Sequence, residues 1–387
     1  MRFVSGLHCL GLRRCLSGRC LQAQGWRAKV RSDLRDAQIA HPLEMSTALR
    51  LLAALAAAAG VVVAAVAILS GGTPDAPEAQ SQSQSQPGPA SVGRPIRVGD
   101  NPIAVAVGAG AIWIIDASRQ TLSKVDPTTR MVVGEPRRVA GGPFAVAVGE
   151  GAVWVAAGDG AVRAYDPRSI RPVGPTTRVP GANGLAVGSG GVWITSRRAG
   201  TVTRIDPRSR RADAPIRVGA GAADVAVGLG AVWVANTDAA SVSRIDPRTA
   251  RAGPPIAVGA RQVLALALGE GGVWIARAGG PNADRVQLVR IDPATGKVAG
   301  DPIAVPGAVP LDLVAGNGLW VTDSGTAIGG PGRRGGVTRA DPATRAVVQS
   351  SLRTGNRPSA IAIGERGVWV TNEGSGTLTP ITIAKPD

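Results

Sequence analysis

Histidine is almost absent from this sequence, and its absence limits the chemistry that the chain can perform. The two histidines, His8 and His41, both precede residue 50. Residues 94–387 therefore offer no Ser-His-Asp triad, no histidine general base and no histidine-ligated zinc. The three cysteines lie within the first 20 residues, and their spacings of five and four intervening residues match no standard zinc motif. Carboxylates remain available, but nothing in the sequence pairs them. We therefore assign no catalytic residue, no metal site and no cofactor.

Arginine is abundant and gives the chain its positive charge. The formal net charge is +16, and arginine accounts for nearly all of the basic residues. A basic balance can indicate nucleic acid or another acidic partner. Aromatic residues other than tryptophan are nearly absent, so a base-stacking surface is not supported. We expect no nucleic-acid partner, and we interpret most of these arginines as a solvated rim.

Six Asp-Pro pairs recur at the same place in the repeat, and a metal ring is one possible interpretation of their carboxylates. Each pair begins a turn, because aspartate can hydrogen-bond its own following backbone and proline presets the next φ angle. Turn formation is the favoured interpretation. The aspartates of the pairs are Asp126, Asp166, Asp206, Asp246, Asp292 and Asp341.

A tryptophan within a short apolar run marks seven copies of a repeat of about 40 residues. The fourth copy contains strand patterns at 224–227, 231–235 and 241–245, and a fourth near 256–258. Short Val- and Ile-rich runs between Gly and Asp-Pro turns predict four strands per copy. The repeat therefore predicts an all-β, seven-bladed β-propeller over residues 94–387. The tryptophans, which we expect to pack between blades, are Trp113, Trp154, Trp193, Trp233, Trp274, Trp320 and Trp369.

The two ends of the repeat array predict how the ring closes. The seventh copy stops after its third strand, at 378–383, and an unattached fourth-strand motif occurs at 95–98. Pairing of these two segments would remove the exposed edges of an open array. Pro380 lies within the last strand and lacks a backbone donor, so we expect weaker pairing there.

The residues before the ring predict a membrane anchor and a linker. Residues 1–50 form a basic tail, of which 1–44 are an incidental extension if Met45 is the true start. Residues 51–70 form a transmembrane helix or, alternatively, a cleaved signal peptide. The Ser-, Gln-, Pro- and Gly-rich residues 71–93 form a flexible linker. The charge bias places the ring outside the cytoplasm of a single-pass membrane protein, and signal cleavage would release it as a secreted protein.

The sequence also resembles known propellers. The motifs WVAN at 233–236, WVTD at 320–323 and WVTN at 369–372 resemble the YVTN-type repeat. The ring as a whole is similar to YncE-like and YVTN-family seven-bladed propellers and to virginiamycin B lyase-like propellers. The lyase resemblance implies a catalytic histidine with a glutamate and magnesium. No histidine is present in the ring to take that role, so we do not carry the activity over.

Loop lengths give the candidate binding site. The distance from Trp to the Asp of the Asp-Pro pair is 12 or 13 residues in the first four copies, 18 in the fifth and 21 in the sixth. The added length lies between the second and third strands, and insertions on one face often mark a binding face. The two insertions, together with the loops that lead into neighbouring first strands, predict a polar binding site. Its arginine side chains would bind an anionic partner with paired hydrogen bonds. Tolerated surface insertions are the alternative. The candidate residues are Arg261, Gln262, Arg277, Asn282, Asp284, Arg285, Asp312, Asp323, Arg333, Arg334, Asn356 and Arg357.

These observations favour a monomeric, membrane-tethered, non-catalytic module that binds an envelope protein or an anionic ligand. The alternative is a lyase-like enzyme that uses carboxylates and a metal. Binding of an envelope component without turnover would separate the two.

Overall fold

The computed structural model describes residues 88–259, 262–278, 286–306, 310–323, 335–364 and 366–384. The chain divides into two units, Met1–Gln82 and Ser83–Asp387, and all described residues belong to the second. The predicted tail, anchor and most of the linker lie outside the described residues. Within the described part, no helix is long and apolar enough to cross a membrane.

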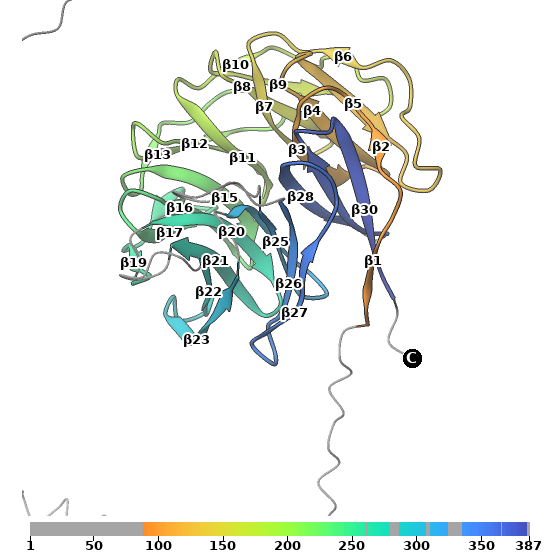
Figure 1. Ribbon diagram of the computed structural model, residues 1–387. Coiled ribbons are helices and arrows are strands. Elements are labelled where there is room, and N and C mark those ends of the chain that lie inside the picture. The colour runs from red at the N-terminus through yellow and green to blue at the C-terminus, as the bar shows by residue number, and fades with distance from the viewer. Residues whose placement is uncertain are drawn as a thin grey trace, which may run out of the picture. The chain divides into compact units, whose positions relative to one another are not determined.

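The described residues form an all-β, seven-bladed propeller, as predicted (Figure 1). Each blade is an antiparallel sheet whose strands follow the chain from the inner strand outward. Blade 1 contains β3 (Pro102–Gly108), β4 (Ala111–Asp116), β5 (Thr121–Val125) and β6 (Arg137–Arg138). Blade 2 contains β7 (Pro143–Gly149), β8 (Ala152–Ala157), β9 (Ala161–Tyr165) and β10 (Thr177–Arg178). Blade 3 contains β11 (Ala182–Gly188), β12 (Gly191–Ser196), β13 (Thr201–Ile205) and β14 (Ile216–Arg217).

The remaining blades differ from the first three in the number or length of their outer strands. Blade 4 contains β15 (Ala222–Gly228), β16 (Ala231–Asn236), β17 (Ser241–Asp246), β18 (Arg251–Ala252) and β19 (Ile256–Ala257). Blade 5 contains β20 (Val263–Gly269), β21 (Gly272–Ala278), β22 (Val286–Ile291) and β23 (Val298–Val305). Blade 6 contains β24 (Pro310–Ala315), β25 (Leu319–Asp323), β26 (Gly336–Asp341) and β27 (Ala346–Leu352). Blade 7 contains β28 (Pro358–Gly364), β29 (Gly367–Asn372) and β30 (Thr377–Ile383), with β1 (Ala90–Val92) and β2 (Ile96–Arg97) from the start of the ring.

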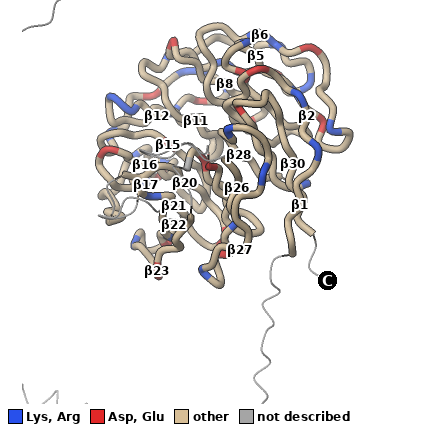
Figure 2. Tube along the Cα trace, in the orientation of Figure 1, with Lys and Arg blue, Asp and Glu red and all other residues tan. Residues whose placement is uncertain are grey.

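The seven inner strands surround the axis of the ring. Each inner strand packs against the inner strand of the next blade, and β28 of blade 7 packs against β3 of blade 1. Lys and Arg recur around the outer loops of the ring (Figure 2). We call the end where the inner strands begin the loop face, and the opposite end, with the Gly-x-Gly hairpins and Asp-Pro turns, the turn face.

Local sequence explains the turn face. In the hairpin between β15 and β16, Leu229 and Gly230 have φ angles of 51° and 74°. Two successive positive φ angles match the right-handed twist of the flanking strands, and glycine adopts them without strain. At the Asp-Pro turns, the Asp126 carboxylate accepts hydrogen bonds from the amides of Thr128 (2.7 Å) and Thr129 (2.8 Å). These backbone bonds lower the pKa of Asp126, and they confirm the turn interpretation of the Asp-Pro pairs.

The seven tryptophans are buried between blades, as predicted. Trp113 of blade 1, for example, packs in one cluster with Val153 and Val155 of blade 2. The Trp113 indole nitrogen donates to the carbonyl of Gly108 over 3.1 Å, and four other blades repeat this bond. Each of these tryptophans therefore joins two blades while its polar atom is satisfied within its own hairpin.

The ring closes through the start of the described chain. Ile96 pairs with Leu378 of β30, which confirms the predicted closure. The pairing also extends further back than the sequence indicated, because β1 pairs Ala90 with Ile383 inside the stretch assigned to the linker. The strand could not be predicted from composition, because its pairing uses backbone groups that every residue carries. Pro380 does not break the sheet, since its carbonyl accepts a bond from the Gly93 amide over 2.8 Å.

Candidate ligand-binding site on the loop face

The strand ends that flank both long insertions lie on the loop face. The fifth-blade insertion is framed by Ala278 and Val286, which pair as the last residues of β21 and the first of β22. The sixth-blade insertion is framed by Asp323 and Gly336, which pair in the same way. Both frames lie at the end of the blade where the inner strand begins. The residues that flank the insertions therefore lie on the face that also carries the starts of the inner strands.

Two aspartates stand out on the inner strands of this face. Asp224 of β15 and Asp312 of β24 occupy the same position of the repeat, next to an irregularity in the strand register. Both side chains are half-buried. The other five blades carry only small residues at this position, namely Ala104, Ala145, Gly184, Ala265 and Ala360.

Each aspartate binds its own strand and the next blade in the same way. Asp224 accepts hydrogen bonds from the amide of Val225 and, across to blade 5, from the amide of Leu266, both over 2.8 Å. Asp312 repeats this arrangement with Leu313 at 2.8 Å and with Ile361 of blade 7 at 2.9 Å. The two carboxylates are thus held in fixed, equivalent orientations by backbone donors.

The environment of the two carboxylates favours their protonated forms. Burial raises the pKa of Asp224 to about 6, although its two backbone hydrogen bonds act in the opposite direction. Burial, followed by the charge on Asp224, raises the pKa of Asp312 to about 7. The two side chains therefore interact electrostatically across the one blade that separates them. Near neutral pH such a pair can hold one proton, so it presents both a hydrogen-bond donor and an acceptor.

Among the described residues, no further metal-ligating side chains gather around Asp224 and Asp312. No group of three or more His, Cys, Asp or Glu residues gathers there in a metal-binding arrangement. The hydroxyl of Thr322, on the neighbouring strand of blade 6, donates to the main-chain carbonyl of Asp312 over 3.4 Å. This arrangement suits hydrogen bonding to a polar ligand group near the ring axis.

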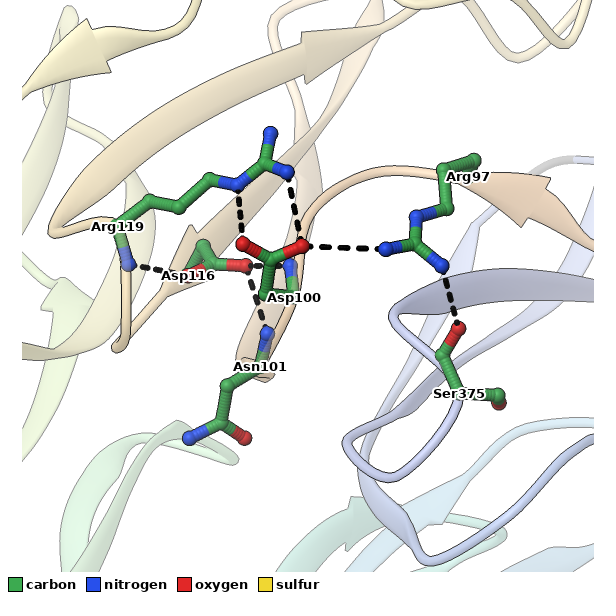
Figure 3. Close-up of polar contacts among 6 residues, drawn as sticks. All are labelled: Arg97, Asp100, Asn101, Asp116, Arg119 and Ser375. Carbon is green, nitrogen blue, oxygen red and sulfur yellow. Dashed lines mark hydrogen bonds and ion pairs between the residues drawn. The ribbon is translucent and has the colours of Figure 1, made fainter.

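In several blades a polar residue at the end of the second strand organises the adjacent loop. In blade 1, the buried Asp116 accepts bonds from the amides of Asn101 (2.8 Å) and Arg119 (2.7 Å), and also from the amide of Asp100 (Figure 3). The Asp100 side chain is in turn held by Arg119 and Arg97. In blades 4 and 7 the same position is asparagine, which explains the Asn in the WVAN and WVTN motifs: Asn236 accepts from the Gly219 amide, and Asn372 accepts from the Thr354 hydroxyl.

Two candidate residues from the sequence occupy this same loop-organising position. Arg277 is the last residue of β21 that pairs with β20 in blade 5. Its guanidinium donates to Gln287 Oε1 at 2.8 and 3.0 Å and to the carbonyls of Val258 and Gly259. Burial lowers the pKa of Arg277. Asp323 ends β25 of blade 6. Arg277 therefore holds the loop that precedes Gln262, and its donors already have protein acceptors.

The remaining described candidates lie in two places. Gln262 is exposed at the start of blade 5, where its carbonyl accepts from the Ala278 amide over 3.1 Å. Arg357 of blade 7 forms an ion pair with Glu373 over 2.8 Å, and the Asn356 carbonyl accepts from the Gly374 amide. The structure thus groups Gln262 with Arg277, and Asn356 with Arg357. Arg261, Asn282, Asp284, Arg285, Arg333 and Arg334 lie outside the described residues.

Sequence reasoning selected Asp312 but missed Asp224. The available signal was positional: of the seven aligned inner strands, only the fourth and sixth carry aspartate where the others carry Ala or Gly. A charged residue at a position otherwise reserved for small residues indicates a local role.

Known proteins resemble this ring in structure but not in sequence. No protein-family model matches the sequence, and no curated protein matches it. Among solved structures, a streptogramin B lyase is 15% identical, with a TM-score of 0.63 over 76% of this chain and 98% of that chain. Virginiamycin B lyase from Staphylococcus aureus is 13% identical, with a TM-score of 0.63 over 76% and 100% of the two chains.

The chain shares the propeller fold of these lyases. A chain of Kuenenia stuttgartiensis hydrazine synthase is equally similar, with 14% identity and a TM-score of 0.64 over 76% and 98% of the two chains. Because structures of two different enzymes match this ring equally well at such low identity, the likeness concerns the fold alone. The resemblance to YVTN-family propellers rests on the strand motifs quoted above.

Proposed function

We propose that this protein is a membrane-tethered, extracytoplasmic propeller that binds an envelope ligand or protein on its loop face. The observation that supports the proposal is the equivalent placement of Asp224 and Asp312, each bridging to the next blade. Nothing in the repeat requires aspartate there, since five blades close with Ala or Gly at the same position. Burying a carboxyl costs desolvation energy, and carboxyls with pKa values raised in this way cluster at functional sites.

The ligand contacts follow from the chemistry of this face. The carboxyl pair binds a hydrogen-bonding group of the ligand near the axis. The arginines of the two insertions, Arg285, Arg333 and Arg334, together with Arg261, contact an anionic group of the same partner. The absence of histidine from the ring supports binding rather than lyase chemistry.

The test compares capture by the full chain in non-ionic detergent with capture by a variant carrying Asp224→Asn and Asp312→Asn. The wild-type protein should retain an envelope component from membrane and cell-wall extracts, and the double variant should lose it. Asp301→Asn, an exposed aspartate of blade 5, is the matched control. Equal capture by wild type and double variant would refute the site. Chemical conversion of the captured component by the wild-type protein would instead support the lyase alternative.

A further inference from the structure

A second surface of the ring has the chemistry of an anion-binding site, and it lies on the turn face, away from the proposed ligand site. A groove of about 1220 Å³ runs between the outer parts of blades 4 and 5. Its basic lining residues are Arg244, Arg248, Arg251 and Lys297. Arg244 lies over the ring of Trp233, with its guanidinium carbon 5.7 Å from the ring centroid.

The positive charge of this groove is only partly neutralised by the described residues. Arg248, Arg251 and Lys297 are exposed, and within the described residues none of them forms an ion pair. The one carboxylate among the lining residues, Asp246, is occupied with its own turn, because it accepts the amide of Arg248 over 2.8 Å. Four cations and one carboxylate leave the groove with a positive net charge, which attracts an anionic ligand.

The groove is open because one residue of the repeat has no side chain. The fourth residue after the Asp of each Asp-Pro pair closes the turn and has a positive φ angle in all six blades that carry the pair. In three blades its side chain reaches back to the preceding blade. The guanidinium carbon of Arg210 of blade 3 lies 4.3 Å from the ring centroid of Trp154, Ile170 of blade 2 packs into the cluster of Trp113, and Arg345 of blade 6 bonds to the carbonyl of Asp301.

In blade 5 the equivalent residue is Gly296, with a φ angle of 65°. It lines the groove and leaves unfilled the space that Arg210 and Ile170 fill elsewhere. A Cβ atom at Gly296 would meet only the side chain of Ile256, at 3.5 Å, which is ordinary contact. The backbone here therefore permits a side chain that would occupy the groove.

We infer that this groove binds a ligand carrying two or more phosphate groups. Arginine forks match phosphate oxygens with paired hydrogen bonds, and Lys297 adds a compact charge at the blade 5 side. Four basic side chains line the groove, and its volume of about 1220 Å³ is larger than a single phosphate group requires.

Isothermal titration of the full chain in non-ionic detergent tests the inference with inorganic tripolyphosphate and orthophosphate as probes. Saturable tripolyphosphate binding, tighter than orthophosphate binding, is expected. Gly296→Ile, which copies Ile170 of blade 2, should weaken it about tenfold or more by filling the groove, and Arg248→Ala with Arg251→Ala should do so by removing charge-assisted bonds. Arg208→Ala, the blade 3 equivalent of Arg248, should leave it unchanged.

Three outcomes would overturn the inference: no saturable tripolyphosphate binding, equal affinity for orthophosphate, or equal loss in Arg208→Ala. Because Gly296→Ile changes shape without charge and the double arginine variant changes charge without filling the groove, unchanged binding in both also contradicts it. Circular dichroism melting confirms that each variant is folded. None of these measurements involves Asp224 or Asp312, so the result is independent of the proposed loop-face function.

Discussion

The charge on Asp224 raises the pKa of Asp312, although the two residues are 88 positions apart in the chain and blade 5 lies between them. Each carboxylate also accepts a hydrogen bond from a backbone amide of the following blade. The same two side chains thus join blade 4 to blade 5 and blade 6 to blade 7, and their protonation is linked to the folding of the ring.

The first prediction concerns pH. Both folded-state pKa values, about 6 and about 7, lie above the ordinary aspartate value of 3.8. The stabilising protonated forms are therefore fully present below about pH 4 and are lost as pH rises through 6 and 7. Replacing both residues by asparagine should flatten this pH dependence and raise the stability at pH 8 by about 1–3 kcal/mol.

Denaturant unfolding at pH 5 and pH 8 measures this effect. Asp301→Asn should change neither the unfolding free energy nor its dependence on pH. A double variant that keeps the wild-type pH dependence between 4 and 8 would show that other groups cause it.

The second prediction concerns the loop-organising carboxylate of blade 1. Asp116→Ala leaves the amides of Asp100, Asn101 and Arg119 without their acceptor, so it should cost about 2–4 kcal/mol of unfolding free energy. Asp116→Asn should cost clearly less unfolding free energy, because Asn236 accepts a loop amide at the equivalent position of blade 4. Equilibrium unfolding in urea compares the two, and equal losses would contradict the assigned role.

The third prediction concerns ring closure. A chain that begins at Asp100 lacks β1 and β2 and exposes the edge of β30. It should melt several degrees lower and aggregate more readily than a chain that begins at Ser83. A chain that begins at Arg94 keeps β2 but loses β1, and it should fall between them. Identical melting of all three chains would show that the closing strands contribute no stability.

The fourth prediction concerns the two insertions. Removing five residues from the 279–285 region and eight from the 324–334 region gives both loops the length found in blade 4. The shortened protein should fold, since blade 4 closes with that length, and should lose the captured envelope partner. Retention assays with the same extracts provide the measurement, and full retention by the folded variant would exclude the insertions from binding.

The fifth prediction concerns topology. Protease added to intact cells should remove the ring from a chain that stays anchored through residues 51–70. Complete protection of the ring would contradict the extracytoplasmic placement. Release of a mature protein that begins near Gly71 would support the signal-peptide alternative.

The sequence by itself determined the number of blades, their strands and the closure. A tryptophan in each copy, the Gly-x-Gly hairpins and the Asp-Pro turns act over a few residues, so their spacing translates directly into local structure. The closing strand was predictable from 95–98 because that motif is a missing part of a repeat. Ala90–Val92 was not, because its pairing comes from backbone groups that every residue carries.

Only the tertiary structure decided which chemical groups meet. Asp224 and Asp312 interact electrostatically because the ring turns equivalent positions of different blades toward one axis. Arg277, which the sequence offered as a free binding residue, is instead held by Gln287 and two carbonyls. The groove beside Gly296 is open because the long side chain that blades 2, 3 and 6 carry at this position is missing there. These outcomes depend on distances between blades, which a one-dimensional repeat does not contain.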